Sequence, residues 1–395
     1  MRRFFSTLRS PLTILSEEQR ILRESARVFA RHEIQPKIRK MDEEAKMCPE
    51  LVKKLFLQGY MGIEVPEKYG GAGLSFTDAL IIVEEISRCD PAVAVLVDIH
   101  NTLMTRAILK FGTEEQQKKF LPKLATECPG SFAISEASAG SDAFAIKTVA
   151  RQVGDKFFIR GEKMWISNSQ EAGIFLVFAK TNPALGHRGI TAFLVEKSDQ
   201  VIVAKKEDKL GIRASSTCVV SFEEAETSEV LGKVGEGYKV AIGLLNEGRI
   251  GIAAQMLGLA KGAFEISAKY LMEREQFGKK LYDFQGLNFQ VARARMEIEA
   301  AHLLVYNAAA LKEMADAGDI SPKDFVKEAS MAKLYASEVA ERTASLAIEW
   351  LGGVGFTKDY PVEKYYRDAK IGAIYEGTSN IQLETIAKQI ANEFK

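Results

Sequence analysis

The sequence predicts an α+β protein, mostly α, with an N-terminal helical domain, a middle β-barrel or sandwich domain and a C-terminal four-helix bundle. Two changes of hydrophobic period along its 395 residues support this architecture. Apolar residues recur at helical spacing at first, then come in short β-branched or aromatic runs, and then return to helical spacing. The predicted boundaries are 1–15 for a separate leading segment, 16–128, 129–237 and 238–395.

The N-terminal part contains several helix-start signals. Ser16-Glu17-Glu18-Gln19 has the pattern of a capping box, and so does Thr113-Glu114-Glu115-Gln116. Further helices are predicted at Pro49–Leu57, Ser75–Ser87 and about Pro91–Phe111. A turn-rich break at residues 66–73 separates the first two of these.

The middle part contains apolar runs separated by glycine-bearing turns. Predicted strands include residues 157–159, 174–178, 190–195 and 218–222. Short strands at this spacing are typical of a barrel or sandwich of roughly a hundred residues.

Long helices are predicted in the last part of the chain, at about Tyr238–Arg274, Gln285–Ala317, Pro322–Leu351 and Ser379–Glu393. Their apolar stripes suit a four-helix bundle. The glycines of residues 352–355 follow a long helix rather than a strand, so they do not indicate a dinucleotide-binding fold.

Composition excludes several classes of function. The chain has 53 basic and 53 acidic residues and a net charge of +0, which gives no support to nucleic-acid or membrane-surface binding. No apolar run is expected to reach the length of a membrane span. The four cysteines form no CxxC pair, which favours free thiols in a reducing compartment, and the four scattered histidines give no support to a metal site.

The leading segment differs in composition from the rest. It carries Arg2, Arg3 and Arg9 with serines, and no acidic residue precedes Glu17. This is typical of a mitochondrial transit peptide and predicts a mitochondrial matrix location, although a frayed start of the mature chain has the same composition.

The stretch from Ala373 to Asn380 carries the strongest chemical signal. Glu376 lies between an aromatic residue and a glycine, after apolar residues and before small polar residues that can begin a helix. A carboxylate with apolar neighbours loses hydration, which raises its pKa toward the range where it can accept a carbon-bound proton. Taken alone, these residues also fit an ordinary loop before a helix.

Two stretches of the middle part fit a flat or phosphorylated ligand. Residues 132–142 combine small residues, a glycine and an acidic residue, and residues 163–168 place Trp165 two positions before Ser167. A surface loop and a core tryptophan are the alternatives for these stretches.

Together these features resemble the acyl-CoA dehydrogenases over nearly the whole chain, from about Leu15 to Glu393. The resemblance rests on five segments in the family's order: Glu136 to Asp142, Trp165-Ile166-Ser167, residues 274–278, residues 351–355 and residues 375–378. It implies an FAD-dependent α,β-dehydrogenation of an acyl-CoA. Residues 246–255 and 349–353 look like those of the subgroup that acts on short or 2-methyl-branched acyl groups.

The resemblance implies the positions that bind FAD between the strand domain and the bundle. Those in the strand domain are Phe132, Ala133, Ile134, Ser135, Glu136, Ala137, Ser138, Ala139, Gly140, Ser141, Trp165, Ile166 and Ser167. Those in the bundle are Arg274, Gln285, Glu349, Trp350, Leu351, Gly352, Gly353, Thr378, Ser379 and Asn380. Arg274, Gln285 and residues 349–353 match positions that reach the cofactor of a neighbouring subunit. Most family members have glutamine where this chain has Glu349.

The resemblance also implies that Glu376 is the catalytic base, which removes the α-proton of the thioester. The substrate-side positions that it implies are Ser141, His187, Tyr238, Asn246, Glu247, Gly248, Arg249, Gly377 and Lys388. In some relatives the base comes from the position of Gly248, and glycine cannot serve as one. Glu247 is one residue away, about 100° around the helix, so its side chain is expected to point elsewhere.

The implied partners are an acyl-CoA substrate, electron-transfer flavoprotein and further copies of the chain in a homotetramer. Two alternative functions remain open at this point. One is an acyl-CoA oxidase, in which oxygen reaches the flavin. The other is a catalytically silent family member that acts as an assembly protein.

Overall fold

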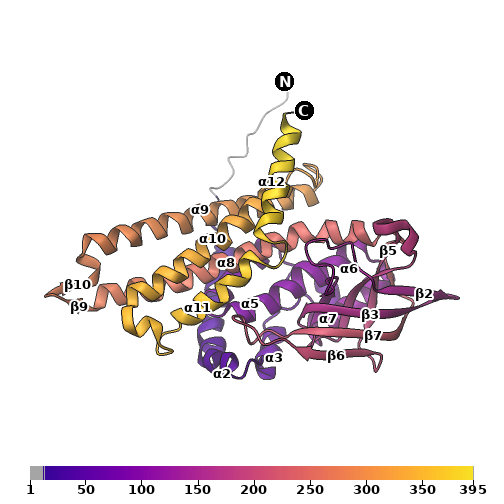
Figure 1. Ribbon diagram of the computed structural model, residues 1–395, viewed down its shortest axis with the longest axis horizontal. Helices are drawn as coiled ribbons and strands as arrows, with labels where there is room; N and C mark the ends of the chain where they lie inside the picture. The colour runs from indigo at the N-terminus through magenta and orange to yellow at the C-terminus, as the bar shows by residue number, and fades with distance from the viewer. Residues whose placement is uncertain (1–11, 13, 395) are drawn as a thin grey trace.

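The computed structural model describes residue 12 and residues 14–394. Along the chain, helices come first, then the strands, then further helices, and Figure 1 shows the large sheet at one end of the molecule with the long helices extending away from it. The predicted fold class is confirmed. Most of the predicted targeting segment, residues 1–15, lies outside the described residues.

The first part of the chain is helical, as predicted. Its α-helices are α1 (Glu17–Phe29), α2 (Ile38–Glu43), α3 (Pro49–Leu57), α4 (Phe76–Ser87), α5 (Pro91–Asp98), α6 (Arg106–Phe111) and α7 (Glu114–Thr126). Capping boxes at Ser16 and Thr113 begin α1 and α7, which confirms both predicted helix starts. A π-helical stretch, Ile99–Thr105, joins α5 to α6 and widens the helix where it faces the bundle.

Among the described residues, the segment Pro91–Phe111 is long and apolar enough to cross a membrane, with a mean hydropathy of 1.3. The expectation that no apolar run has this length is therefore wrong. Within the fold, 89% of the 18-residue apolar stretch of this segment is buried, which is the environment of a core helix in a globular protein.

The middle of the chain forms an eight-stranded sheet. Its strands are β1 (Gly130–Ala133), β2 (Val149–Val153), β3 (Lys156–Ser167), β4 (Ile174–Lys180), β5 (Ile190–Glu196), β6 (Val201–Lys206), β7 (Thr217–Thr227) and β8 (Val230–Leu231). They follow the order β6-β7-β3-β2-β4-β5-β8, and β1 pairs in parallel with β4. The long strand β3 shifts register against β7 between Lys163 and Ile166, and this irregularity turns Trp165 outward.

The last part of the chain is dominated by long helices: α8 (Gly237–Glu273), α9 (Gln285–Asp316), α10 (Val326–Leu351), α11 (Val362–Ala369) and α12 (Ser379–Glu393). A small hairpin, β9 (Glu275–Gln276) and β10 (Lys279–Lys280), joins α8 to α9 at the end of the bundle away from the large sheet (Figure 1). Helix α8 has 37 residues and is therefore about 55 Å long. The short helix α11 was not predicted from the sequence.

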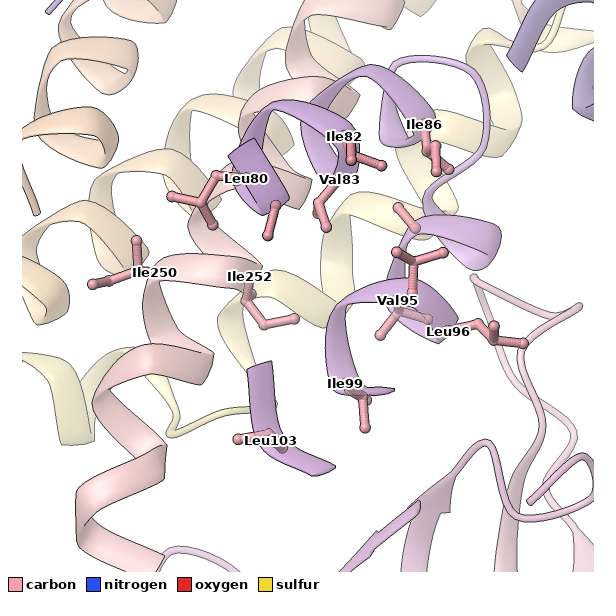
Figure 2. Packing of buried hydrophobic residues seen from close by; sticks show 14 of the residues in the cluster. Leu80, Ile82, Val83, Ile86, Val95, Leu96, Ile99, Leu103, Ile250 and Ile252 are labelled. Atoms are coloured by element: carbon pink, nitrogen blue, oxygen red, sulfur yellow. The ribbon is translucent and has the colours of Figure 1, made fainter. Parts of the chain in front are cut away.

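One hydrophobic core joins the N-terminal helices to the bundle. Figure 2 shows Leu80 and Val83 of α4 and Val95 of α5 on the side of Ile252 of α8, whereas Leu96 points away from α8 on the other side of α5. A second core lies within the sheet and includes Phe175, Phe193 and Phe222. The shared helical core fixes α5 and the π-helical stretch against α8, and this placement positions the candidate site.

Candidate active site

Glu376 lies in a tight turn between the bundle and α12. Its backbone φ is +50°, and that of Gly377 is +85°. A glutamate seldom adopts this left-handed conformation, whereas glycine adopts it freely. Immediately afterwards, the Thr378 side chain accepts a hydrogen bond from the Ile381 N–H and begins α12.

Two buried side chains hold this turn. The Gln382 side-chain amide donates to the carbonyl oxygen of Glu376 at 3.0 Å and to that of Gly377 at 2.9 Å. Lys333 of α10 donates from Nζ to the Gly377 carbonyl oxygen at 2.7 Å. Both side chains are fully buried, so the unusual backbone is fixed from the interior of the bundle.

The Glu376 carboxyl lies over Gly248 of α8. A Cβ built on Gly248 would be 2.8 Å from Oε2 of Glu376 and 3.0 Å from Cδ2 of Leu103. Oε2 is buried and has no hydrogen-bond partner among the described residues. Glycine at position 248 therefore provides the space that the carboxyl occupies, and the carboxyl keeps a free oxygen.

Burial and two cations set the charge state of this carboxyl. Loss of hydration raises the pKa of Glu376 to about 7, although the positive charges of Lys333 and Arg249 oppose the rise. A group with this pKa exists in both protonation states near neutral pH, as a general base requires.

A second carboxyl lies close by. Asp98, at the end of α5, is buried, and a Cβ on Gly251 would lie 2.0 Å from its Oδ1. Burial raises the pKa of Asp98 well above its usual value, and the charge of Glu376 raises it further. Gly248 and Gly251, three residues apart on α8, thus make room for two neighbouring carboxyls.

Most of the predicted substrate-side residues of α8 lie near this turn. The Arg249 guanidinium donates to Oδ1 of Asn246 at 3.0 Å and to the Ser330 hydroxyl at 3.1 Å, and one of its nitrogens would lie 3.8 Å from a Cβ on Gly377. Glu247 points elsewhere, as its helical position predicts. Its carboxylate pairs with Arg106 and Lys110, each at 2.8 Å, so its side chain is not available to a ligand.

The remaining substrate-side positions lie at the surface. His187 and Tyr238 contact each other edge to face, with ring centroids 5.0 Å apart, beside the start of α8. Ser141 is exposed on the loop after β1, and Lys388 is exposed on α12, about 15 Å along the helix from Thr378.

The residues of the strand domain fit a flavin. Trp165 is 54% exposed with a backbone φ of +64°, so a large ring faces outward from the sheet. The hydroxyl of Ser167, two residues later, has no hydrogen-bond partner in the described part of the chain, which leaves a donor free. A Cβ on Gly140 would meet nothing within 4 Å, so the loop there is open.

Glu136 has a structural role in the same loop. Its carboxylate accepts hydrogen bonds from the N–H groups of Lys147 and Thr148 and pairs with the fully buried Lys163 at 2.9 Å. These contacts hold the loop of residues 136–148 against β3. The neighbouring Phe132, Ala133 and Ile134 are buried, so they line the loop from below.

The other predicted cofactor positions are far from this surface within one chain. Arg274 follows α8 at the hairpin end of the bundle, whereas the start of α8 packs on β5, so the two ends are about 55 Å apart. Glu349 and Gln285 are exposed, and Gly352 and Gly353 have open space around them. Trp350 is buried and donates to Gln290, so its ring belongs to the core.

Sequence reasoning missed Lys333, Gln382 and Asp98. Lys333 falls on the small-residue face of α10 with Ala329 and Ala336, and a charge on such a stripe is a signal of a buried function. Asp98 is likewise a lone acid within an apolar run. Nothing in the sequence around Gln382 distinguishes it from a surface glutamine of an amphipathic helix.

Family models match almost the whole chain. The model of the acyl-CoA dehydrogenase N-terminal domain matches residues 16–127, that of the middle domain residues 131–225 and that of the C-terminal domain residues 235–391.

Known proteins resemble the chain over nearly its whole length. The mitochondrial short/branched chain specific acyl-CoA dehydrogenase of Rattus norvegicus is 54% identical over 98% of this chain and 88% of its own length. The corresponding Bos taurus protein is 53% identical over the same shares.

Solved structures of similar proteins have the same fold as this chain. Butyryl-CoA dehydrogenase from Megasphaera elsdenii has a TM-score of 0.91 at 36% identity, covering 96% of this chain and 99% of that one. A chain in the structure of the electron transferring flavoprotein of Acidaminococcus fermentans has a TM-score of 0.92 at 38% identity over the same shares. An acyl-CoA dehydrogenase complexed with FAD from Bacillus anthracis has a TM-score of 0.88 at 32% identity, covering 96% of this chain and 67% of that one.

Proposed function

The chain belongs to the acyl-CoA dehydrogenase family, and we propose that Glu376 is the base with which it dehydrogenates its substrate. The enzyme converts short or 2-methyl-branched acyl-CoA to trans-2-enoyl-CoA with FAD and passes the electrons to electron-transfer flavoprotein. The observation that carries the role of Glu376 is its buried, unpartnered carboxylate oxygen over Gly248.

The base works because its surroundings raise its proton affinity. An α-proton of a thioester is too weakly acidic for a carboxylate in water, so the site must both strengthen the base and stabilise the developing enolate. Burial strengthens the base, because it brings the pKa of Glu376 to about 7. Lys333 and Arg249 hold enough positive charge nearby for the carboxylate to be present in its ionised form.

The backbone of Glu376 can help to stabilise the developing enolate. Its N–H has no hydrogen-bond acceptor among the described residues, so this donor remains free. A preorganised donor to the thioester oxygen contributes roughly 3–4 kcal/mol to the stabilisation of a developing oxyanion. Gln382 and Lys333 keep this donor in place through the two carbonyl groups that follow.

The flavin ring would lie on the surface formed by Trp165, Ser167 and the loop after β1. Thr378 and Ser379, at the start of α12, would be available to the phosphates of FAD. FAD supplies the hydride acceptor for the β-carbon. Arg274, Gln285 and residues 349–353 would meet the cofactor of a neighbouring subunit, since α8 separates them from this surface.

We also propose a homotetramer in the mitochondrial matrix. Phe289, Met296 and Leu303 recur every seven residues on α9 and are 63%, 60% and 45% exposed, so one apolar stripe of the bundle is uncovered in the single chain. The relatives from rat and cattle are mitochondrial enzymes, which supports a mitochondrial location. Light scattering coupled to gel filtration of the purified protein measures the assembly directly.

Replacement of the base tests the proposed function. Glu376→Gln keeps the shape of the side chain and removes its basicity, so the purified variant should keep its yellow flavin and lose at least ~100-fold in kcat. Glu384→Gln, an exposed glutamate of α12, is the matched control and should keep full activity. Retained turnover in the Glu376 variant would remove this residue from the reaction.

The assay also separates the alternative functions. Fast peroxide formation without an electron acceptor would identify an oxidase, and a wild-type protein that binds no FAD would identify an assembly protein. Initial rates with 2-methylbutanoyl-, isobutanoyl-, butanoyl- and hexanoyl-CoA rank the acyl groups.

A further inference from the structure

Lys333 has an unusual environment for a lysine. It lies on α10 among Ala329, Ala332 and Ala336, and its exposed fraction is 0%. The Gly377 carbonyl oxygen is the single hydrogen-bond acceptor of its Nζ in the described part of the chain, and no carboxylate there lies within ion-pair distance. An ammonium has three N–H donors, so two of them remain for other groups at the site.

A buried lysine without a direct ion pair is costly, because an ammonium loses its hydration. Burial lowers the pKa of Lys333 to about 8, the charge of Glu376 raises it, and the charge of Arg249 lowers it. The residue is therefore mostly charged at neutral pH. A lysine needed only to fill space between helices would be replaced at less cost by an apolar residue of similar volume.

The hydrogen bond of Lys333 is directed at the least regular part of the site. Glu376 and Gly377 are consecutive left-handed residues, and the Gly377 carbonyl accepts from both Lys333 and Gln382. Without the lysine, only the Gln382 amide would hold the peptide that follows the catalytic carboxyl.

The charged and titratable groups around Glu376 come from several elements. Lys333 of α10 and Arg249 of α8 supply positive charge, Asp98 at the end of α5 is a second buried carboxyl whose pKa is raised, and Tyr375 precedes the glutamate and donates to Gln255. Burial, the charge of Asp98 and the charge of Glu376 all raise the pKa of Tyr375 above its usual value, so this phenol carries no charge near pH 7. The positive charge near the base therefore comes from two residues, and Arg249 is itself engaged by Asn246 and Ser330.

We propose that Lys333 is a positioning residue for the dehydrogenation, with two separable actions: its hydrogen bond holds the Glu376–Gly377 turn, and its charge keeps Glu376 ionised. This inference rests on the proposed role of Glu376 as the base.

Three substitutions separate the two actions. Lys333→Gln keeps a hydrogen-bond donor and removes the charge, Lys333→Met removes both, and Lys333→Arg keeps the charge. Lys323→Gln, an exposed lysine before α10, is the control for handling and assay. The flavin absorption spectrum and the thermal unfolding temperature of each holoenzyme report whether the fold and the cofactor are retained.

The readout is kcat at saturating acyl-CoA as a function of pH, with an artificial electron acceptor. In Lys333→Gln the rising limb should move to higher pH by about 1 unit or more, the lower end of the effect of a neighbouring opposite charge. At the high-pH plateau this variant should approach the wild-type rate, whereas Lys333→Met should stay about 10-fold or more below it, because its turn is no longer held. In Lys333→Arg the rise of kcat with pH should occur at the same pH as in the wild type.

A Lys333→Gln profile that superimposes on the wild-type profile would overturn the electrostatic action, and equal plateaus for Lys333→Gln and Lys333→Met would overturn the positional one. Glu376→Gln, assayed in parallel, keeps this inference distinct from the proposed function. If that variant is inactive and the Lys333 variants behave as wild type, only the inference fails. If that variant is active, the assignment of the base fails, whatever the lysine does.

Discussion

Gly248→Ala tests the geometry of the base with a single methyl group. An added Cβ would lie 2.8 Å from Oε2 of Glu376, and ordinary contacts begin at 3.4 Å, so the carboxyl must retreat by about 0.6 Å. Leu103, 3.0 Å from the same Cβ, leaves no room for the methyl group to turn away.

A displacement of this size has a predictable effect on the rate. A misplacement of 1 Å costs up to about 100-fold in an enzyme whose groups must meet the substrate in a fixed geometry, so kcat should fall by about 10- to 100-fold. The protein should still fold, because alanine is favoured over glycine within a helix by about 1 kcal/mol, and this gain offsets part of the clash.

The assay compares kcat, flavin content and thermal stability of Gly248→Ala with those of Gly243→Ala. The control lies on the same helix, and its Cβ would meet only the far edge of the Phe111 ring, at 2.9 Å. It should keep wild-type activity. A Gly248→Ala enzyme with a kcat within about threefold of wild type would show that the carboxyl does not need the space above this glycine.

Three further predictions follow from the site. In the free enzyme, kcat/KM should rise with pH through about 7, because only ionised Glu376 accepts a proton; a flat profile between pH 5.5 and 8.5 would contradict this. Asp98→Asn should stabilise the protein increasingly above pH 4, since the folded pKa of Asp98 is raised and its carboxyl ionises more easily when unfolded. Between the unfolded and the folded pKa of Asp98, the free energy of unfolding of the wild type therefore falls by up to about 1.4 kcal/mol per pH unit. Urea titrations in which Asp98→Asn is more stable than the wild type by the same amount at pH 5 and at pH 8 would refute a raised pKa for Asp98 in the folded protein. Gln382→Leu should lower the stability by about 1–3 kcal/mol, because the carbonyls of Glu376 and Gly377 lose a donor, and it should also reduce kcat if Glu376 is the base as proposed. Urea unfolding with wild-type stability would count against this role of Gln382.

The parts of the fold that depend on neighbours along the chain were predictable. The capping boxes at Ser16 and Thr113 and the long bundle helices follow from residues within a few positions of each other, and all are present. Helix α11 was missed because its charged residues look solvent-exposed in the sequence. Its Lys364 is buried by pairing with Asp368 one turn away and with Asp90, which is 274 residues distant in the chain.

The sequence by itself determined the fold class and the family and singled out Glu376 as the proposed base, because periodicity, capping and the order of short motifs are properties of the linear chain. Only the tertiary structure decided what surrounds that base. Lys333 is 44 residues from the carbonyl that it holds, and the space above Gly248 exists only where α8 passes beneath the turn. Hydration, charge and free volume depend on which atoms are close in space, so the proton affinity of Glu376 became apparent only once the helices were packed.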